Sequence, residues 1–143
     1  MDKLENNVLY ILDKAFRSYH QYASNQLKKH GFSITVDQWL VLKTALENPE
    51  LSQKQLSDVL YKDNASITRI IQHLEKSEYL TTSQHPSDRR RTILKITDLG
   101  KKITSDVHKI ALKNREIALT DISTHDINTL NSILQKIINN TKP

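Results

Sequence analysis

Apolar residues recur at three- and four-residue steps along most of this 143-residue chain, which is the spacing of one face of an α-helix. The first such run extends from Leu4 to Leu27, and Gly31 follows it where a helix would end. Residues suited to capping a helix N-terminus precede the next three runs: Thr35, Ser52 and Asp63. Glutamine three residues after Thr35 and Ser52 completes the capping-box pattern at both positions. The first part of the chain is therefore expected to form four helices.

The spacing changes after Leu80. Residues 81–84 and 92–96 are short segments rich in β-branched side chains, and the stretch between them contains a proline and three consecutive arginines. This pattern predicts an antiparallel hairpin with a long basic tip. Two more capping residues, Thr97 and Ser123, then introduce helical spacing again. The expected fold class is mainly α with a small β-hairpin (α+β).

The length suits one domain, or a compact lobe with an oligomerisation element. We expect three parts: an N-terminal helix in residues 1–34, a compact lobe in 35–97 and two C-terminal helices in 98–143. The outer two parts carry more apolar surface than packing against the lobe should need. They are therefore predicted to be dimerisation helices that bring two copies of the chain together.

Composition excludes several classes of site. There is no cysteine, so no disulfide or thiol nucleophile can form, and two glycines are too few for a dinucleotide fingerprint or a phosphate-binding loop. No two of the six histidines are four residues apart, and no apolar stretch is long enough to span a membrane. We predict a cytoplasmic protein without catalytic site, metal, cofactor or membrane partner. Metal sensing through ligands distant in sequence, and a role as a protein-interaction module, stay open as alternatives.

The positive charge is concentrated in one segment. The chain has 21 basic and 16 acidic side chains, giving a formal net charge of +5. Residues 84–102 alone contain six basic residues against two acidic ones. A local basic cluster on an otherwise neutral body is typical of a surface that binds a polyanion, although a solvated charged loop has the same composition.

The fourth helix is predicted to present a polar face opposite its apolar stripe. The residues on or beside that face are Asn64, Ala65, Ser66, Thr68, Arg69, Gln72 and Lys76. They are small near the helix N-terminus, include no acid, and offer hydroxyl, amide and guanidinium groups that can reach base edges or phosphates. The third and fourth helices, joined by a three-residue turn and followed by a basic hairpin, form the pattern of a winged helix-turn-helix. Double-stranded DNA is therefore the expected partner.

Residues 88–97, Asp-Arg-Arg-Arg-Thr-Ile-Leu-Lys-Ile-Thr, resemble the wing signature of the MarR family of bacterial transcription regulators. Residues 51–56 and 66–76 resemble the two helix-turn-helix helices of that family in the same order and spacing. The resemblance implies a homodimer on a palindromic operator, and we expect a repressor. Glycine is common in the family where Glu78 stands, and arginine or lysine where Thr82 stands.

The resemblance also implies roles for individual residues. In the wing, made by Arg89, Arg90 and Arg91, Arg90 would enter the minor groove while Asp88 braces the loop by pairing with an arginine. Ser66, Thr68 and Arg69 would contact the major groove. The preceding helix would contact the DNA through Ser52, Gln53 and Lys54, with Gln53 on the backbone.

A small anionic or phenolic effector is a further implication of the family resemblance. It would bind between the dimer helices and the DNA-binding lobe and change the spacing of the recognition helices. Four residues could border such a pocket: Arg17, Tyr19, His20 and Trp39. Tyr19 and Trp39 also fit the helical spacing of core residues, and a single histidine is commonly structural.

Overall fold

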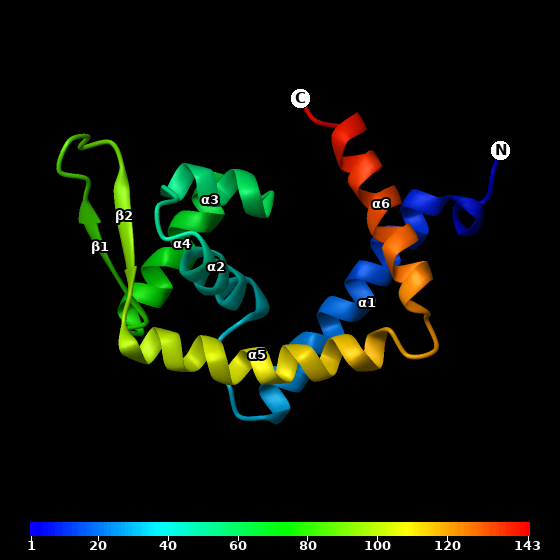
Figure 1. Ribbon diagram of the computed structural model, residues 1–143, viewed down its shortest axis with the longest axis horizontal. Coiled ribbons are helices and arrows are strands. Elements are labelled where there is room, and N and C mark those ends of the chain that lie inside the picture. The colour runs from blue at the N-terminus through cyan, green and yellow to red at the C-terminus, as the bar shows by residue number, and fades with distance from the viewer.

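The computed structural model describes residues 1–143 and has the expected order of four helices, a hairpin and two helices (Figure 1). The helices are α1 (Val8–Lys29), α2 (Val36–Glu47), α3 (Gln53–Leu60), α4 (Asn64–Lys76), α5 (Asp98–Ala118) and α6 (Thr124–Asn140), and the strands are β1 (Leu80–Gln84) and β2 (Thr92–Ile96). A single 3-10 turn, Leu4–Asn6, precedes α1. The predicted fold class is confirmed.

Helices α2 to α6 begin where the capping residues predicted, whereas α1 begins at Val8, capped by Asn7, and not at Leu4 as expected. The Thr35 hydroxyl accepts a hydrogen bond from the Gln38 backbone N–H at 3.1 Å, and the Gln38 side chain accepts one from the Thr35 N–H at 3.0 Å. Ser52 and Gln55 form the same reciprocal pair. These bonds satisfy N–H groups that have no partner within the helix, which is why the sequence determines these boundaries locally.

One core of fourteen buried residues holds the molecule together. α2, α3 and α4 contribute half of it, and the hairpin adds Leu80, Leu94 and Ile96. Leu27 from α1 and Val107 from α5 belong to the same cluster. The core therefore crosses both expected boundaries, because the inner ends of α1 and α5 pack directly against the winged lobe.

Close packing attaches the start of α5 to the turn between α4 and the hairpin. A Cβ atom on Gly100 would lie 2.0 Å from the carbonyl oxygen of Tyr79, so only glycine allows this approach. The Thr97 hydroxyl donates to the Glu78 carbonyl oxygen at 2.7 Å, and the Thr97 N–H donates to the Tyr79 carbonyl oxygen at 3.1 Å. These contacts determine the direction in which α5 leaves the hairpin.

Glu78 adopts the left-handed conformation, with φ 64°, after the last turn of α4. The N–H of Tyr79 bonds to the carbonyl of Leu74 and the N–H of Glu78 to that of Glu75, which is the helix-ending arrangement that glycine normally serves. We expect Glu78→Gly to raise the free energy of unfolding by about 0.5–1 kcal/mol. Relief of left-handed strain, roughly 1–2 kcal/mol, exceeds the entropy that glycine adds to the unfolded chain.

Urea unfolding of Glu78→Gly would measure this gain, with Glu78→Ala as its control. Alanine has the same left-handed strain as glutamate, so the alanine variant should show no gain. If both variants raised the free energy of unfolding equally, the Glu78 carboxylate would be the destabilising group, and not the left-handed backbone.

The end of the molecule away from the hairpin is loosely packed. Figure 1 shows α5 running from the hairpin at one end to α6 at the other, with the N-terminal turn also at the α6 end. No residue of α6 is buried. Large apolar side chains are exposed on all three terminal helices: Leu9, Leu12, Phe16, Leu112, Ile117, Leu130 and Ile133. No helix is both long and apolar enough to cross a membrane.

Candidate nucleic-acid interface

The turn between α3 and α4 sets the angle of the second helix. Tyr61 takes the left-handed conformation there, with φ 52°, and the Lys62 N–H bonds to the Ser57 carbonyl oxygen at 3.1 Å. The buried Ser57 hydroxyl donates back to the Lys62 carbonyl oxygen. Leu56 and Ile67, which face each other's helices in the core, are fully buried. The turn bonds and these core residues thus set the orientation of α4 against α3.

The polar face of α4 is open to solvent, as the helical wheel predicted. Ile67, Ile71 and Leu74 are buried on the inner side. Exposed on the outer side are Asn64, Ala65, Arg69, Gln72 and Lys76, while Ser66 and Thr68 are half-buried. The outer side can therefore approach a flat or grooved partner along the length of the helix.

Two of the candidate residues are bonded to each other. The Gln53 amide donates to the Thr68 hydroxyl at 2.6 Å, and that hydroxyl donates to the Asn64 carbonyl oxygen at 2.9 Å. Gln53 keeps a second N–H and its carbonyl oxygen free for a partner. The Thr68 hydroxyl is therefore bonded both to Gln53 and to the first turn of α4.

The N-terminus of α4 is capped by an acid. The Asp63 carboxylate accepts from the Ser66 N–H at 3.2 Å, and the bonds to Ser66 hold the pKa of Asp63 below its ordinary value of 3.8. Because the folded pKa is the lower one, the cap stabilises the fold above pH 3.8 and is lost as the pH falls below it. Arg69 also bonds to the Ser66 hydroxyl, at 3.3 Å, so its guanidinium is held over the first turn.

The wing is closed by backbone bonds around Asp88. The His85 N–H donates to the Arg91 carbonyl oxygen, and the Arg91 N–H to that of Asp88, both at 3.0 Å. The Asp88 carboxylate accepts from the Arg90 backbone N–H at 3.0 Å and lies 3.6 Å from the Arg90 Nε. Asp88 therefore braces Arg90 itself, whose side chain is 94% exposed. Arg89 is exposed beside it.

One hollow joins the wing to both helices of the helix-turn-helix. It has a volume of about 470 Å³ and no apolar residue in its lining. Six of the seven lining residues are candidates from the sequence, and the seventh is Thr92 at the start of β2: Ser52, Gln53, Lys54, Asn64, Arg90, Arg91 and Thr92. Three are cationic and none is acidic, so the hollow suits a phosphate backbone. Arg69, Gln72 and Lys76 continue along α4 outside it.

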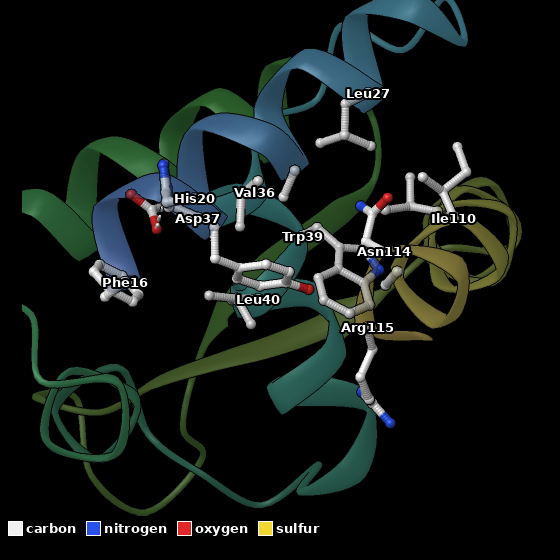
Figure 2. A pocket seen from close by; sticks show the side chains of 14 residues that line it. Phe16, His20, Leu27, Val36, Asp37, Trp39, Leu40, Ile110, Asn114 and Arg115 are labelled. Carbon is white, nitrogen blue, oxygen red and sulfur yellow. Dashed lines mark ion pairs between the residues drawn. The ribbon is translucent and has the colours of Figure 1, made fainter. Parts of the chain in front are cut away.

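A second, mainly apolar cavity lies between α1, α2 and α5 (Figure 2). Its volume is about 210 Å³, and three of the four residues expected to border an effector pocket line it: Tyr19, His20 and Trp39. Arg17 lies outside it. The Arg17 guanidinium is exposed and bonds to Asp13 at 2.8 Å, which raises the pKa of Arg17 above its ordinary value.

Sequence reasoning missed three polar residues of this cavity: Asp37, Asn114 and Arg115. One signal could have found Asn114, because it continues the apolar spacing of Val107 and Ile110 on the inner face of α5. Asp37 lies at the rim, where its carboxylate is 3.9 Å from His20 Nε2 and 3.1 Å from Lys62 Nζ. Since Lys62 lies between α3 and α4, this ion pair joins the cavity wall to the turn before α4.

Comparison with known proteins covers nearly the whole chain. Residues 34–92 match the sequence model of the MarR family. The HTH-type transcriptional regulator MhqR of Bacillus subtilis is 24% identical over 132 residues, covering 92% of this chain and 90% of its own. SarZ of Staphylococcus aureus, also an HTH-type transcriptional regulator, is 29% identical over 121 residues, covering 82% of this chain and 80% of its own. The family model and these relatives indicate a regulator of the MarR family.

Solved structures share the MarR-family fold. A MarR mutant from Escherichia coli in complex with operator DNA has a TM-score of 0.80 at 20% identity, over 89% of this chain and 90% of its own. The PcaV regulator of Streptomyces coelicolor, in complex with its natural ligand, has a TM-score of 0.83 at 16% identity, over 99% of both chains. Together, the family model, the curated relatives named as transcriptional regulators and this shared fold indicate a winged-helix transcription regulator.

Glu78 and Thr82, which depart from the common MarR-family residues, each have a defined place in the structure. Glu78 keeps the left-handed backbone that glycine would adopt more readily. The Thr82 hydroxyl donates to the Glu75 carboxylate at 2.7 Å and so joins β1 to the end of α4. At position 82, where the family commonly has arginine or lysine, threonine thus makes a contact within the lobe.

Proposed function

We propose that two copies of this MarR-family protein bind a palindromic operator, each placing α4 in the major groove and Arg90 in the adjacent minor groove. The hollow that unites Lys54, Asn64 and Arg90 is the observation that carries this proposal. Positive charge and hydrogen-bond donors from α3, α4 and the wing converge there without any acidic side chain. Phosphate contacts in this hollow would set the position of α4, and the exposed face of α4 would read the bases.

The homodimer is supported by the terminal helices. A 17-residue helix without a buried residue, such as α6, is only marginally stable by itself in water. Its apolar stripe, which includes Leu130 and Leu134, needs a cover that this chain does not provide. A second copy related by a twofold axis would bury these stripes and place two recognition helices on one face of the DNA. In this arrangement residues 35–97 form the DNA-binding lobe, and 1–34 with 98–143 supply the dimer helices.

Repression is the proposed outcome of operator binding, with release by a small molecule in the cavity between α1, α2 and α5. The link from Asp37 on the cavity wall to Lys62 before α4 supports this coupling. An effector that displaces Asp37 would shift α4. The distance between the two copies of α4 in the dimer would then change, and with it the fit to the two halves of the operator. PcaV, solved with its natural ligand, shares the fold in which this cavity lies.

A salt series on a bound genomic DNA fragment would test the interface. Affinity falls as salt rises, and Lys54→Ala is expected to make the plot of log affinity against log salt less steep by about 0.9, because one phosphate contact is lost. Lys28→Ala removes the same charge near the C-terminal end of α1, away from α3 in Figure 1, and should leave the slope unchanged. Equal slopes for Lys54→Ala and the unaltered protein would contradict the proposed interface.

A further inference from the structure

The hairpin that carries the wing is supported by the core only at its base. Its buried residues are Leu80, Leu94 and Ile96, and none of residues 83–93 is buried. In Figure 1 the hairpin stands on the start of α5, and its tip lies at the end away from α5. A two-stranded hairpin is marginally stable by itself in water, so the upper part depends on contacts outside the core for its orientation.

One side-chain hydrogen bond joins the hairpin to the recognition helix α4. The hydroxyl of Thr82, a half-buried residue opposite Leu94 in the strand register, donates to the Glu75 carboxylate at 2.7 Å. It is the only side-chain hydrogen bond that a residue of either strand forms. A hydroxyl bonded to a carboxylate is stronger than a bond between neutral groups, and a β-branched side chain has few rotamers. This contact is therefore suited to hold one geometry.

Glu75 lies on the side of α4 that faces the rest of the DNA-binding lobe. It follows Thr68 by seven residues, or two helical turns, so the two side chains lie on the same side of the helix. Thr68 is bonded to Gln53 of α3, and Glu75 is bonded to Thr82 of β1. The same side of α4 is thus attached to α3 near its start and to the hairpin near its end, which leaves the outer side open.

A small tilt of the hairpin would move the wing by a distance that matters for DNA binding. Strands rise about 3.3 Å per residue, so β1 extends roughly 13 Å from Leu80 to Gln84. A tilt of about 10° at the base would move the far end of β1 by about 2 Å, whereas the minor groove of B-DNA is only about 6 Å wide. Arg90 lies beyond that end. Its entry into the minor groove while α4 occupies the major groove therefore requires a defined angle between the hairpin and α4.

We propose that Thr82 and Glu75 are positioning residues for DNA binding. Their hydrogen bond sets the angle of the hairpin to α4, and this angle places Arg90 in the minor groove of an operator that α4 contacts in the major groove. Neither positioning residue touches DNA in this arrangement. The inference rests on the operator complex proposed above, and it adds the contact that keeps α4 and Arg90 at the spacing of the two grooves.

Thr82→Val would test the bond, because it removes the hydroxyl and keeps the β-branched shape. We expect operator affinity to fall about three- to tenfold, which corresponds to one hydrogen bond. Affinity for random DNA and the salt dependence should stay unchanged, because no charge is lost. Thr82→Ser keeps the hydroxyl and should restore most of the operator affinity. A serine variant as weak as the valine variant, or an equal loss on random DNA, would overturn the proposal.

Thr81→Val is the matched control for this series. It makes the same change at the neighbouring residue, which is exposed and forms no side-chain hydrogen bond, so operator affinity should not change. Urea unfolding of each variant would check that the lobe is folded at the temperature of the DNA titrations. An equal loss of operator affinity in Thr81→Val would show that valine on β1, and not the lost bond, weakens binding.

The Arg90→Ala background distinguishes positioning from a purely structural role. If the bond acts through Arg90, Thr82→Val should lower operator affinity less than about twofold once Arg90 is alanine, which is within the error of additive behaviour. The same loss with and without Arg90 would mean that the bond only stabilises the lobe, and the proposal would fail.

The angle of the hairpin can be measured without DNA. The chain has no cysteine, so Gln72→Cys with Arg89→Cys would place spin labels only on α4 and on the wing. With labelled chains diluted in an excess of unlabelled protein, Thr82→Val should broaden the distribution of distances between the two labels, and Thr82→Ser should not. An unchanged distribution in the valine variant would overturn the proposal. If Arg90→Ala leaves operator affinity unchanged, the operator complex fails, and the label distances still decide whether this bond holds the hairpin.

Discussion

Aspartate at both Leu130 and Leu134 is expected to convert the dimer to monomer and to lower affinity for a palindromic operator at least about 100-fold. Leu130 is 47% exposed and Leu134 half-buried in the single chain, on one stripe of α6. In a dimer each carboxylate would be buried without a partner, which costs several kcal/mol. Losing the second recognition helix removes the avidity gain, which reaches about 10²–10⁴ for linked sites.

Sedimentation across a concentration series would measure the first effect, and operator titration the second. The monomer mass is 16.5 kDa, so the unaltered protein should sediment at twice that value. Asn128→Asp with Ser132→Asp is the matched control, because it adds the same charge on the opposite side of α6. A dimer that survives aspartate at Leu130 and Leu134 would show that α6 is not part of the interface.

Arg90→Ala is expected to weaken operator binding by roughly 1–3 kcal/mol, or about 5- to 150-fold, with no change in the free energy of unfolding. Its side chain is 94% exposed and forms one ion pair, with Asp88, so its removal leaves the core untouched. An arginine in the minor groove interacts with focused negative potential, which makes it worth more than a single phosphate contact at the surface.

Arg89→Ala provides the comparison within the wing. It removes the same charge from the neighbouring residue, which has no bond to Asp88. We expect a smaller loss of affinity, similar on operator and random DNA. Equal losses in the two variants would show that the wing contributes charge alone, and unchanged operator affinity in Arg90→Ala would refute the role assigned to Arg90.

The sequence predicted the local structure because local interactions determine it. Thr35, Ser52 and Asp63 start their helices by hydrogen bonds that reach only three residues along the chain. β2 begins and ends at the predicted residues, and β1 begins one residue earlier than expected, at Leu80. The polar face of α4 also follows from periodicity alone, since the buried stripe of a helix fixes its opposite side.

Tertiary structure decided which of these residues meet. Gln53 and Thr68 are fifteen residues apart, and their bond could not be read from either helix separately. The same holds for the cavity: Arg17 and His20 are neighbours on α1, but only His20 reaches the lining. Asn114 is polar by sequence, and only the packing of α5 against α1 and α2 makes it a buried residue of the cavity lining.

Helix ends, strand positions and the basic charge of the wing were thus determined by the sequence itself, through contacts spanning a few residues. The basic hollow, the apolar cavity and the tie from Asp37 to Lys62 were decided only by the fold. Each needs side chains from separate elements to lie within a few ångströms. That proximity depends on how the helices pack, which local hydrogen bonding does not specify.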